Sequence, residues 1–163
     1  MTEDILTELN HEGLREEFFK YTRRAFEMLP VMDKPGILDI GCGSGGPSIE
    51  LSRLSDGEII GIDINKSLLE KMQSKMEKAG LSERVKLKAI SLYNTNFPDG
   101  KFDILWEEGV LHLLDRKRFL SQCNRLLKPS GYLVMFETIK WMKKNMKKII
   151  SFNFRVVDKF LLP

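Results

Sequence analysis

Short, largely apolar runs alternate along the chain with longer segments whose apolar residues recur every three or four positions. The apolar runs lie at Ile37–Ile40, Ile59–Ile62, Val85–Ile90, Phe102–Trp106, Tyr132–Phe136 and Phe154–Leu161. Short runs that are apolar on both sides are typical of strands in a parallel sheet covered by helices on both faces. The alternation therefore predicts an α/β fold.

The longer segments carry the start and stop signals of helices. Asp115 can cap one of them, Gly80 can end another, and Pro30 and Pro129 follow two more. Helices are predicted at about Glu12–Leu29, Lys66–Ala79 and Asp115–Leu127, with a basic helix after Phe136. A further predicted helix follows the first strand and ends at Leu54. No linker or repeat interrupts the pattern, and 163 residues suit one core. We expect a single domain over residues 1–163, with a doubly wound, mostly parallel sheet in three α/β/α layers.

A glycine-rich turn follows the first predicted strand, over residues 41–46. Glycine lets a backbone turn sharply and approach a ligand, and the helix that follows offers N–H groups and a favourable dipole. Asp63 ends the second strand, twenty residues after Gly43. A carboxylate in that place can accept hydrogen bonds from both hydroxyls of a ribose. The pattern predicts an adenosine-containing cofactor at the carboxyl edge of the sheet.

The glycine spacing alone fits two cofactors. Gly41, Gly43 and Gly46 satisfy the dinucleotide pattern G-x-G-x-x-G, whereas Gly41, Gly43 and Gly45 satisfy G-x-G-x-G. Asp39, two residues before the turn, would repel a pyrophosphate but suits a cationic group, such as the amino group or sulfonium of S-adenosylmethionine. An NAD(P)-dependent oxidoreductase remains an alternative, as does a catalytically silent binding module on the same fold.

In this turn and three later segments the sequence resembles the class I S-adenosylmethionine-dependent methyltransferases. The matching segments are Asp39–Gly45, Asp63, Phe97–Leu105 and Leu126–Leu133. The small-molecule enzymes of quinone and sterol biosynthesis are the most similar branch. The resemblance implies a Rossmann-like methyltransferase fold with strand order 3-2-1-4-5-7-6, the last strand antiparallel. It also implies methyl transfer from S-adenosylmethionine to a small-molecule acceptor, with S-adenosylhomocysteine as product.

The resemblance further implies which residues contact the cofactor. The backbone of the glycine turn would hold the methionine part, Asp39 its amino group, Asp63 the ribose and Ile64 the adenine face. Ser91 stands where an acid is common in the family, so its contact with the adenine edge is a departure from the pattern. The full expected set is Tyr21, Arg23, Asp39, Gly41, Cys42, Gly43, Gly45, Asp63, Ile64, Ser91, Leu92, Trp106 and Glu107.

The sequence does not identify a catalytic residue. His112 and Glu107 are weak candidates for a general base, since both follow or end the fourth strand. Of the neighbouring Glu107 and Glu108, one is expected to enter the pocket and the other to meet water. Cys42 has no histidine near it in sequence to activate a thiolate, so it is interpreted as a small turn residue.

In the resembling family the region before the first strand folds over the cofactor as a lid. The predicted N-terminal helix carries aromatic and basic residues there. We expect one of Tyr21, Thr22 or Arg23 to reach the methionine carboxylate.

Charge is distributed unevenly along the chain. Residues 1–70 carry 7 Lys or Arg against 14 Asp or Glu, and residues 71–163 carry 19 against 9. The densest basic stretch, Lys140–Lys159, could bind nucleic acid, anionic lipid or an acidic substrate, but helical apolar spacing favours a solvated helix face. The fourth strand ends in Trp-Glu-Glu-Gly rather than a nucleic-acid methylation motif, so nucleic acid is an unfavoured substrate.

Further sequence features bear on membrane insertion, the cellular compartment, the cysteines and the outer edge of the sheet. No apolar run approaches the roughly 18 residues that a membrane span needs. The acidic start, Met1–Asp4, does not resemble a signal peptide, so the cytoplasm is the expected compartment. Cys42 and Cys123 form no disulfide framework and suggest no metal site. The segment Phe154–Leu161 resembles the first strand of the family's terminal hairpin, and only Leu162 and Pro163 follow it for the last strand. The fifth strand would then have an unpaired apolar edge, which natural proteins avoid. We therefore expect either a truncated chain or a partner strand that completes the sheet, as in a homodimer.

Overall fold

The computed structural model describes residues 11–136 and 155–157, with the side chains of residues 11–18, 112, 136 and 155–157 outside that description. The described strands form one sheet in the order β3-β2-β1-β4-β5-β6, and every neighbouring pair is parallel. Their bounds are β1 Ile37–Ile40, β2 Ile59–Asp63, β3 Val85–Ala89, β4 Phe102–Glu108, β5 Leu127–Phe136 and β6 Arg155–Val157. The predicted doubly wound parallel sheet is confirmed.

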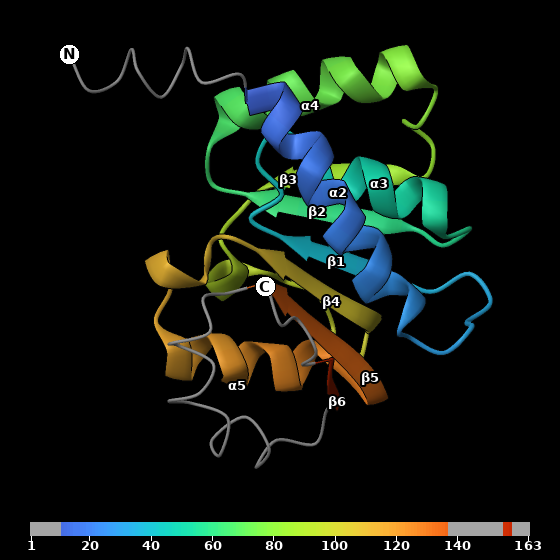
Figure 1. The fold of residues 1–163 in the computed structure, drawn as a ribbon. Helices are drawn as coiled ribbons and strands as arrows, with labels where there is room; N and C mark the ends of the chain where they lie inside the picture. Colours follow the sequence, from blue (N-terminus) through green and yellow to red (C-terminus); the bar gives the residue numbers. More distant parts are fainter. Residues whose placement is uncertain (1–10, 137–154, 158–163) are drawn as a thin grey trace.

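Helices cover both faces of this sheet. Helices α2 (His11–Glu27), α3 (Gly46–Leu54) and α4 (Lys66–Ala79) lie on one side, and α5 (Arg116–Leu126) lies on the other (Figure 1). Two single turns of 3₁₀ helix, η1 (Leu92–Asn94) and η2 (Leu111–Leu113), follow β3 and β4. Helix α4 ends at Gly80 as the sequence predicts, with Gly80 at φ +68°. The Asn65 side chain caps the start of α4 by accepting the Leu68 N–H.

Each face of the sheet has its own core. On the α5 side, Phe119 and Leu126 pack against strand residues such as Leu105. On the other side, Met72 of α4 and Leu51 of α3 pack against a second set of strand residues. Both cores are built on the same strands, because neighbouring residues of a strand point to opposite faces.

The chain reverses direction between β1 and β4. After β1 it runs outward through β2 to β3, then returns to pair β4 with the other edge of β1. Ligands in open parallel sheets bind at the carboxyl ends of the strands beside such a reversal. The register sets Asp39 opposite Trp106 and Ile40 opposite Glu107. The glycine turn and the end of β4 are therefore neighbours.

The fifth strand differs from the sequence prediction. It begins at Leu127 directly after α5, five residues before the predicted start at Tyr132. Phe102 pairs with Leu127 and Ile104 with Tyr132, so the register shifts across an irregular stretch that includes Ser130 at φ +67°. Pro129 was interpreted as the end of a helix, but proline is also tolerated at such an irregularity in a strand.

The outer edge of β5 also differs from what the resemblance implies. Tyr132, Leu133 and Val134 pair in parallel with Arg155, Val156 and Val157 of β6. The expectation of an antiparallel strand next to β5, and of an unpaired edge there, is wrong for these residues. Free strand-edge groups gain hydrogen bonds by pairing, and β6 supplies them. The predicted basic helix lies outside the described residues.

Candidate functional site

The glycine-rich turn connects β1 to α3 at the carboxyl edge. Gly41 has φ +73°, and a Cβ there would lie 2.4 Å from Cγ1 of Val110, so the residue after β4 packs directly on the turn. Gly43 also has a positive φ, +53°, but the nearest atoms to an added Cβ are 3.9 Å away. The turn is thus closed by protein at Gly41 and has room beside it at Gly43.

The amide groups of this turn are bonded within the protein. The N–H groups of Gly41 and Cys42 both donate to the carbonyl of Ile62, at 2.8 and 3.1 Å. The Gly43 N–H donates to Oδ2 of Asp63 at 2.9 Å. A pyrophosphate needs N–H donors, whereas an ammonium group needs acceptors. The first part of the turn therefore suits a cationic ligand group better than a phosphate.

Cys42 points away from that space. Its Sγ lies 2.9 Å from where a Cβ on Gly61 of β2 would be, and its side chain is buried. Burial, followed by the charges of Asp39 and Asp63, raises the pKa of the Cys42 thiol. A raised thiol pKa disfavours the thiolate that a nucleophile needs. The interpretation of Cys42 as a small turn residue agrees with this geometry.

Asp63 and Ile64 extend the same edge from β2. Besides Gly43, the Asp63 carboxylate accepts the Asn65 N–H through Oδ1 at 2.8 Å. A carboxylate has about four acceptor positions, so capacity remains for ribose hydroxyls. The Ile64 side chain next to it is 77% exposed, which is unusual for a large apolar residue and suits stacking by a planar ring.

Asp39 lies beneath the turn, buried at 1% exposure. The Ser48 hydroxyl on α3 donates to its Oδ2 at 2.5 Å. Burial raises the pKa of Asp39 to about 7; the Ser48 bond opposes that shift, and the charges of Glu108 and Asp63 add to it. Asp39 is therefore a carboxylate whose charged form is costly unless a cation comes near.

Ser91 and Leu92 follow β3. The Ser91 hydroxyl caps η1 by accepting the Tyr93 N–H at 3.3 Å, and the side chain is half-buried. Leu92 is buried in the α5-side core. Ser91 thus keeps a hydroxyl with further hydrogen-bonding capacity at this edge, while Leu92 has only its backbone to offer a ligand.

Glu107 holds the turn that follows β4. It is completely buried, and its Oε1 accepts the N–H groups of Val110 and Leu111 at 2.7 and 2.9 Å. These bonds fix Val110, which is the residue that packs on Gly41. The geometry therefore supports a positioning role for Glu107 more than the catalytic one considered from sequence. The side chain of His112, the other candidate, lies outside the described residues.

Trp106 and Glu108 point to the opposite face of β4 from Glu107. The Trp106 indole is buried, 6.5 Å from the Phe26 ring, and its N–H donates to Oε1 of Glu108 at 2.7 Å. Glu108 is half-buried, and burial raises its pKa. Of these paired glutamates, Glu107 is buried and Glu108 is half-buried, so the expectation that one of the two meets water is met only in part, by Glu108.

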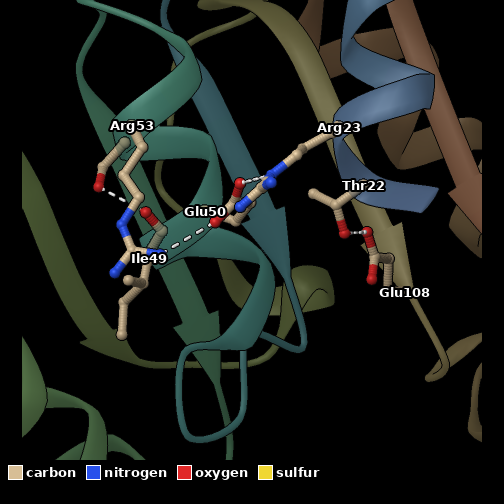
Figure 2. Close-up of polar contacts among 7 residues, drawn as sticks. Thr22, Arg23, Ile49, Glu50, Arg53 and Glu108 are labelled. Atoms are coloured by element: carbon tan, nitrogen blue, oxygen red, sulfur yellow. Dashed lines mark hydrogen bonds and ion pairs between the residues drawn. The ribbon is translucent and has the colours of Figure 1, made fainter. Parts of the chain in front are cut away.

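Helix α2 is attached to this site by two polar contacts (Figure 2). The Thr22 hydroxyl donates to Oε1 of Glu108 at 2.9 Å. Arg23 forms an ion pair with the buried Glu50 of α3, which also pairs with Arg53 at 3.1 Å. The hydrogen bond that Arg23 donates to Glu50, and then the negative charge of Glu50, raise the pKa of Arg23. In this structure Arg23 is therefore directed to α3, and half of its side chain remains exposed.

The structure brings most of the expected residues together. Asp39, Asp63, Ile64 and the glycine turn share one edge with the end of β4. Tyr21 is half-buried on α2, with the Lys20 ammonium 5.0 Å from its ring centre. Sequence reasoning missed three of the partners that hold these groups, namely Ser48, Glu50 and Val110, and it named Glu108 only as the neighbour of Glu107. Ser48 lies in the first turn of α3, where a polar side chain is the one local signal that could have pointed to it.

A family model described as "Methyltransferase domain" matches residues 38–135 of this chain. The chain belongs to this methyltransferase domain family. The match covers all the elements from β1 to β5, which includes the glycine turn, Asp63 and the end of β4.

Named relatives of the methyltransferase domain agree with this membership. The chain is 32% identical over 75% of its length to 27-O-demethylrifamycin SV methyltransferase of Amycolatopsis mediterranei, covering 45% of that protein. It is 29% identical over 96% of its length to the ubiquinone/menaquinone biosynthesis C-methyltransferase UbiE of Shewanella baltica, covering 62%. The crystal structure of the [4+2]-cyclase SpnF is also similar, with a TM-score of 0.66 and 26% sequence identity. The match covers 74% of this chain and 46% of the SpnF chain. The chain spans about half the length of the first of these relatives.

The residues of the domain fit the cofactor of the family. Acceptors line the edge: the Asp39 and Asp63 carboxylates and turn carbonyls, beside an exposed Ile64. Within residues 11–136 no helix could cross a membrane. The same part of the chain gathers no group of three His, Cys, Asp or Glu side chains fit to hold a metal ion.

Proposed function

We propose that this methyltransferase domain binds S-adenosylmethionine at the carboxyl edge of the sheet and transfers its methyl group to a small molecule, giving S-adenosylhomocysteine. The observation that carries the proposal is the glycine turn itself. Its first three N–H groups are bonded within the protein, and carboxylates surround it. That combination suits an ammonium and a sulfonium, and it disfavours a dinucleotide pyrophosphate.

Each residue of the edge has a role in this proposal. Asp39 attracts the amino group of the cofactor, Asp63 accepts from the ribose hydroxyls, and Ile64 packs on the adenine. Glu107 fixes Val110 on Gly41 and so keeps the turn in shape. The cofactor supplies an activated methyl group, so the domain has mainly to align an acceptor and exclude water. His112 remains the candidate base for an acceptor that must lose a proton.

The acceptor is proposed to be a small, largely apolar molecule. The names of the relatives, which refer to rifamycin SV, ubiquinone and menaquinone, support this class. We also propose a cytoplasmic protein, supported by two cysteines that are both free and buried. A homodimer remains a prediction, and sedimentation velocity over a range of concentrations tests it.

Binding and turnover together test the proposed function. Titration calorimetry with S-adenosylmethionine, S-adenosylhomocysteine and NAD⁺ should show micromolar binding of the first two and none of NAD⁺. Mass spectrometry should then detect S-adenosylhomocysteine when hydroquinones and macrocyclic phenols are supplied as acceptors. Tighter binding of NAD⁺ would support the oxidoreductase instead. Binding without product across the acceptors would favour a silent module.

A further inference from the structure

Glu108 and Asp39 are two carboxylates on one face of neighbouring strands. Asp39 pairs with Trp106 in the β1–β4 register, and Glu107 pairs with Ile40, so Glu108 follows beside Gly41 at the start of the turn. The two acids interact electrostatically, since the charge of Glu108 adds to the raised pKa of Asp39 after the effect of burial. Two carboxyl groups therefore lie together at the point where β1 enters the glycine turn, and each makes the negative charge of the other more costly in the absence of a cation.

Among the described residues, the hydrogen-bond donors to these two carboxylates are neutral. Ser48 donates to Asp39, and Thr22 and Trp106 both donate to Oε1 of Glu108. Among the ion pairs of the described residues, none involves Asp39 or Glu108. Arg23 of α2 is directed to Glu50 on α3, as Figure 2 shows. Within the described residues, this pair of acids therefore has no ion-pair partner.

Resting on the proposed function, we infer that Glu108 is a specificity-determining residue of the cofactor site. Its charge, together with that of Asp39, selects the sulfonium form of the cofactor over the thioether that remains after methyl transfer. S-adenosylmethionine and S-adenosylhomocysteine both carry an ammonium and a carboxylate, and they differ by one methyl group and one positive charge. An uncompensated carboxylate beside the turn attracts that extra charge, and the attraction is lost when the methyl group leaves.

The charge of Glu108 and the position of its carboxylate have separate tasks. Thr22 and Trp106 hold one oxygen of Glu108, which fixes the carboxylate and attaches α2 to β4. Removing the Thr22 hydroxyl disturbs position but leaves the charge. Replacing Glu108 by glutamine removes the charge, while the amide oxygen can still accept both bonds.

Equilibrium binding of the two ligands to matched variants tests this assignment. The wild-type protein, Glu108→Gln and Thr22→Val are titrated by calorimetry with S-adenosylmethionine, S-adenosylhomocysteine and sinefungin. In sinefungin a carbon that bears an amino group replaces the methylated sulfur. Glu108→Gln should raise the dissociation constants of S-adenosylmethionine and sinefungin by about tenfold or more. The dissociation constant of S-adenosylhomocysteine should change by less than twofold. Thr22→Val should weaken all three ligands by similar factors. Circular dichroism confirms that each variant is folded.

Two results would overturn the inference, and they are distinguishable. If wild-type protein binds the ligands but Glu108→Gln leaves the ratio of their dissociation constants unchanged, Glu108 only holds α2 and the proposed function stands. If wild-type protein binds none of the three ligands, the proposed function fails and the inference fails with it.

Discussion

At the scale of single residues, the most consequential group is the buried carboxyl of Asp39. Its pKa is about 7 in the folded protein, against an ordinary value of 3.8, mainly because burial disfavours the charge. The groups that face it are Ser48 of α3, Glu108 of β4 and Asp63 of β2. An acid with a raised folded pKa stabilises the fold below its unfolded pKa, and this stability is lost as the pH rises through the folded pKa.

We therefore expect the ligand-free protein to lose stability between about pH 4 and pH 7, by at most about 4 kcal/mol from this group. Asp39→Asn should remove that loss and make the protein more stable than wild type at pH 8. Urea unfolding at pH 5 and pH 8 measures the free energy of unfolding of wild type and variant at each pH. The exposed Asp56, which accepts a backbone N–H from Lys34, provides the matched control Asp56→Asn. Equal pH dependence in Asp39→Asn and wild type would show that Asp39 is not the group responsible.

Gly41 gives a second residue-scale prediction. Gly41→Ala combines an unfavourable φ of +73° with a 2.4 Å approach to Val110. Gly80→Ala meets the same kind of φ, +68°, with nothing within 4 Å, so it isolates the backbone strain. We expect Gly80→Ala to cost about 1 kcal/mol and Gly41→Ala about 2–4 kcal/mol, because overlap adds to strain. Thermal unfolding compares them, and equal costs would mean that Val110 moves aside freely.

These residues show which parts of the candidate site can be predicted from the sequence and which cannot. The positions of Asp39, Gly41 and Asp63 could be predicted because their spacing follows from a strand, a turn and a second strand. Their partners could not, since Ser48, Glu108 and Val110 reach them only through the relative placement of α3, β4 and β1. Long-range contacts of this kind leave no local pattern in the chain.

At the scale of elements, α2 is the part that depends most on polar contacts. Its inner face is buried through residues such as Ala25, but two of its attachments are the Thr22–Glu108 bond and the Arg23–Glu50 ion pair. Glu50 is 1% exposed in its side chain and would lose one of two cationic partners if Arg23 were removed. Breaking a buried pair on one side leaves a charge poorly compensated.

Arg23→Ala should therefore loosen α2 selectively. We expect faster amide hydrogen exchange over residues 19–27, with β1 and β4 unchanged. Arg53→Ala is the matched control, since it removes the other partner of Glu50 without touching α2. Exchange measured by mass spectrometry should be near wild type over α2 in that variant. The same acceleration in both variants would mean that Glu50, rather than the link between helices, governs α2.

Helices were the most predictable elements and strand ends the least. The boundaries of α4 follow directly from Asn65 and Gly80, because caps are local chemistry. The start of β5 depends on pairing with β4 across a register shift, and Pro129 gave a misleading local signal. The partner of the outer edge of β5 was likewise decided by strand pairing that no local pattern encodes.

At the scale of the whole molecule, one sheet supports two cores. Phe119 is completely buried on the α5 side, while Trp106 is buried on the α2 side among residues of the other core. Both side chains pack against strands that contribute alternate residues to each face. If the single domain expected from the sequence is correct, damage to one face must destabilise the other to the same extent.

Phe119→Ala should therefore lower the unfolding free energy by about 3–5 kcal/mol, as large-to-small changes in a core do, and shift every probe together. The measurement is urea unfolding in a Trp141→Phe background, so that Trp106 alone reports the α2 side by fluorescence while circular dichroism reports all helices. We expect the two transitions to coincide in Phe119→Ala and in the milder Phe119→Leu. A fluorescence transition that stays at its wild-type midpoint while the circular dichroism transition moves would mean that the two faces unfold separately, and the single-domain prediction would then be wrong.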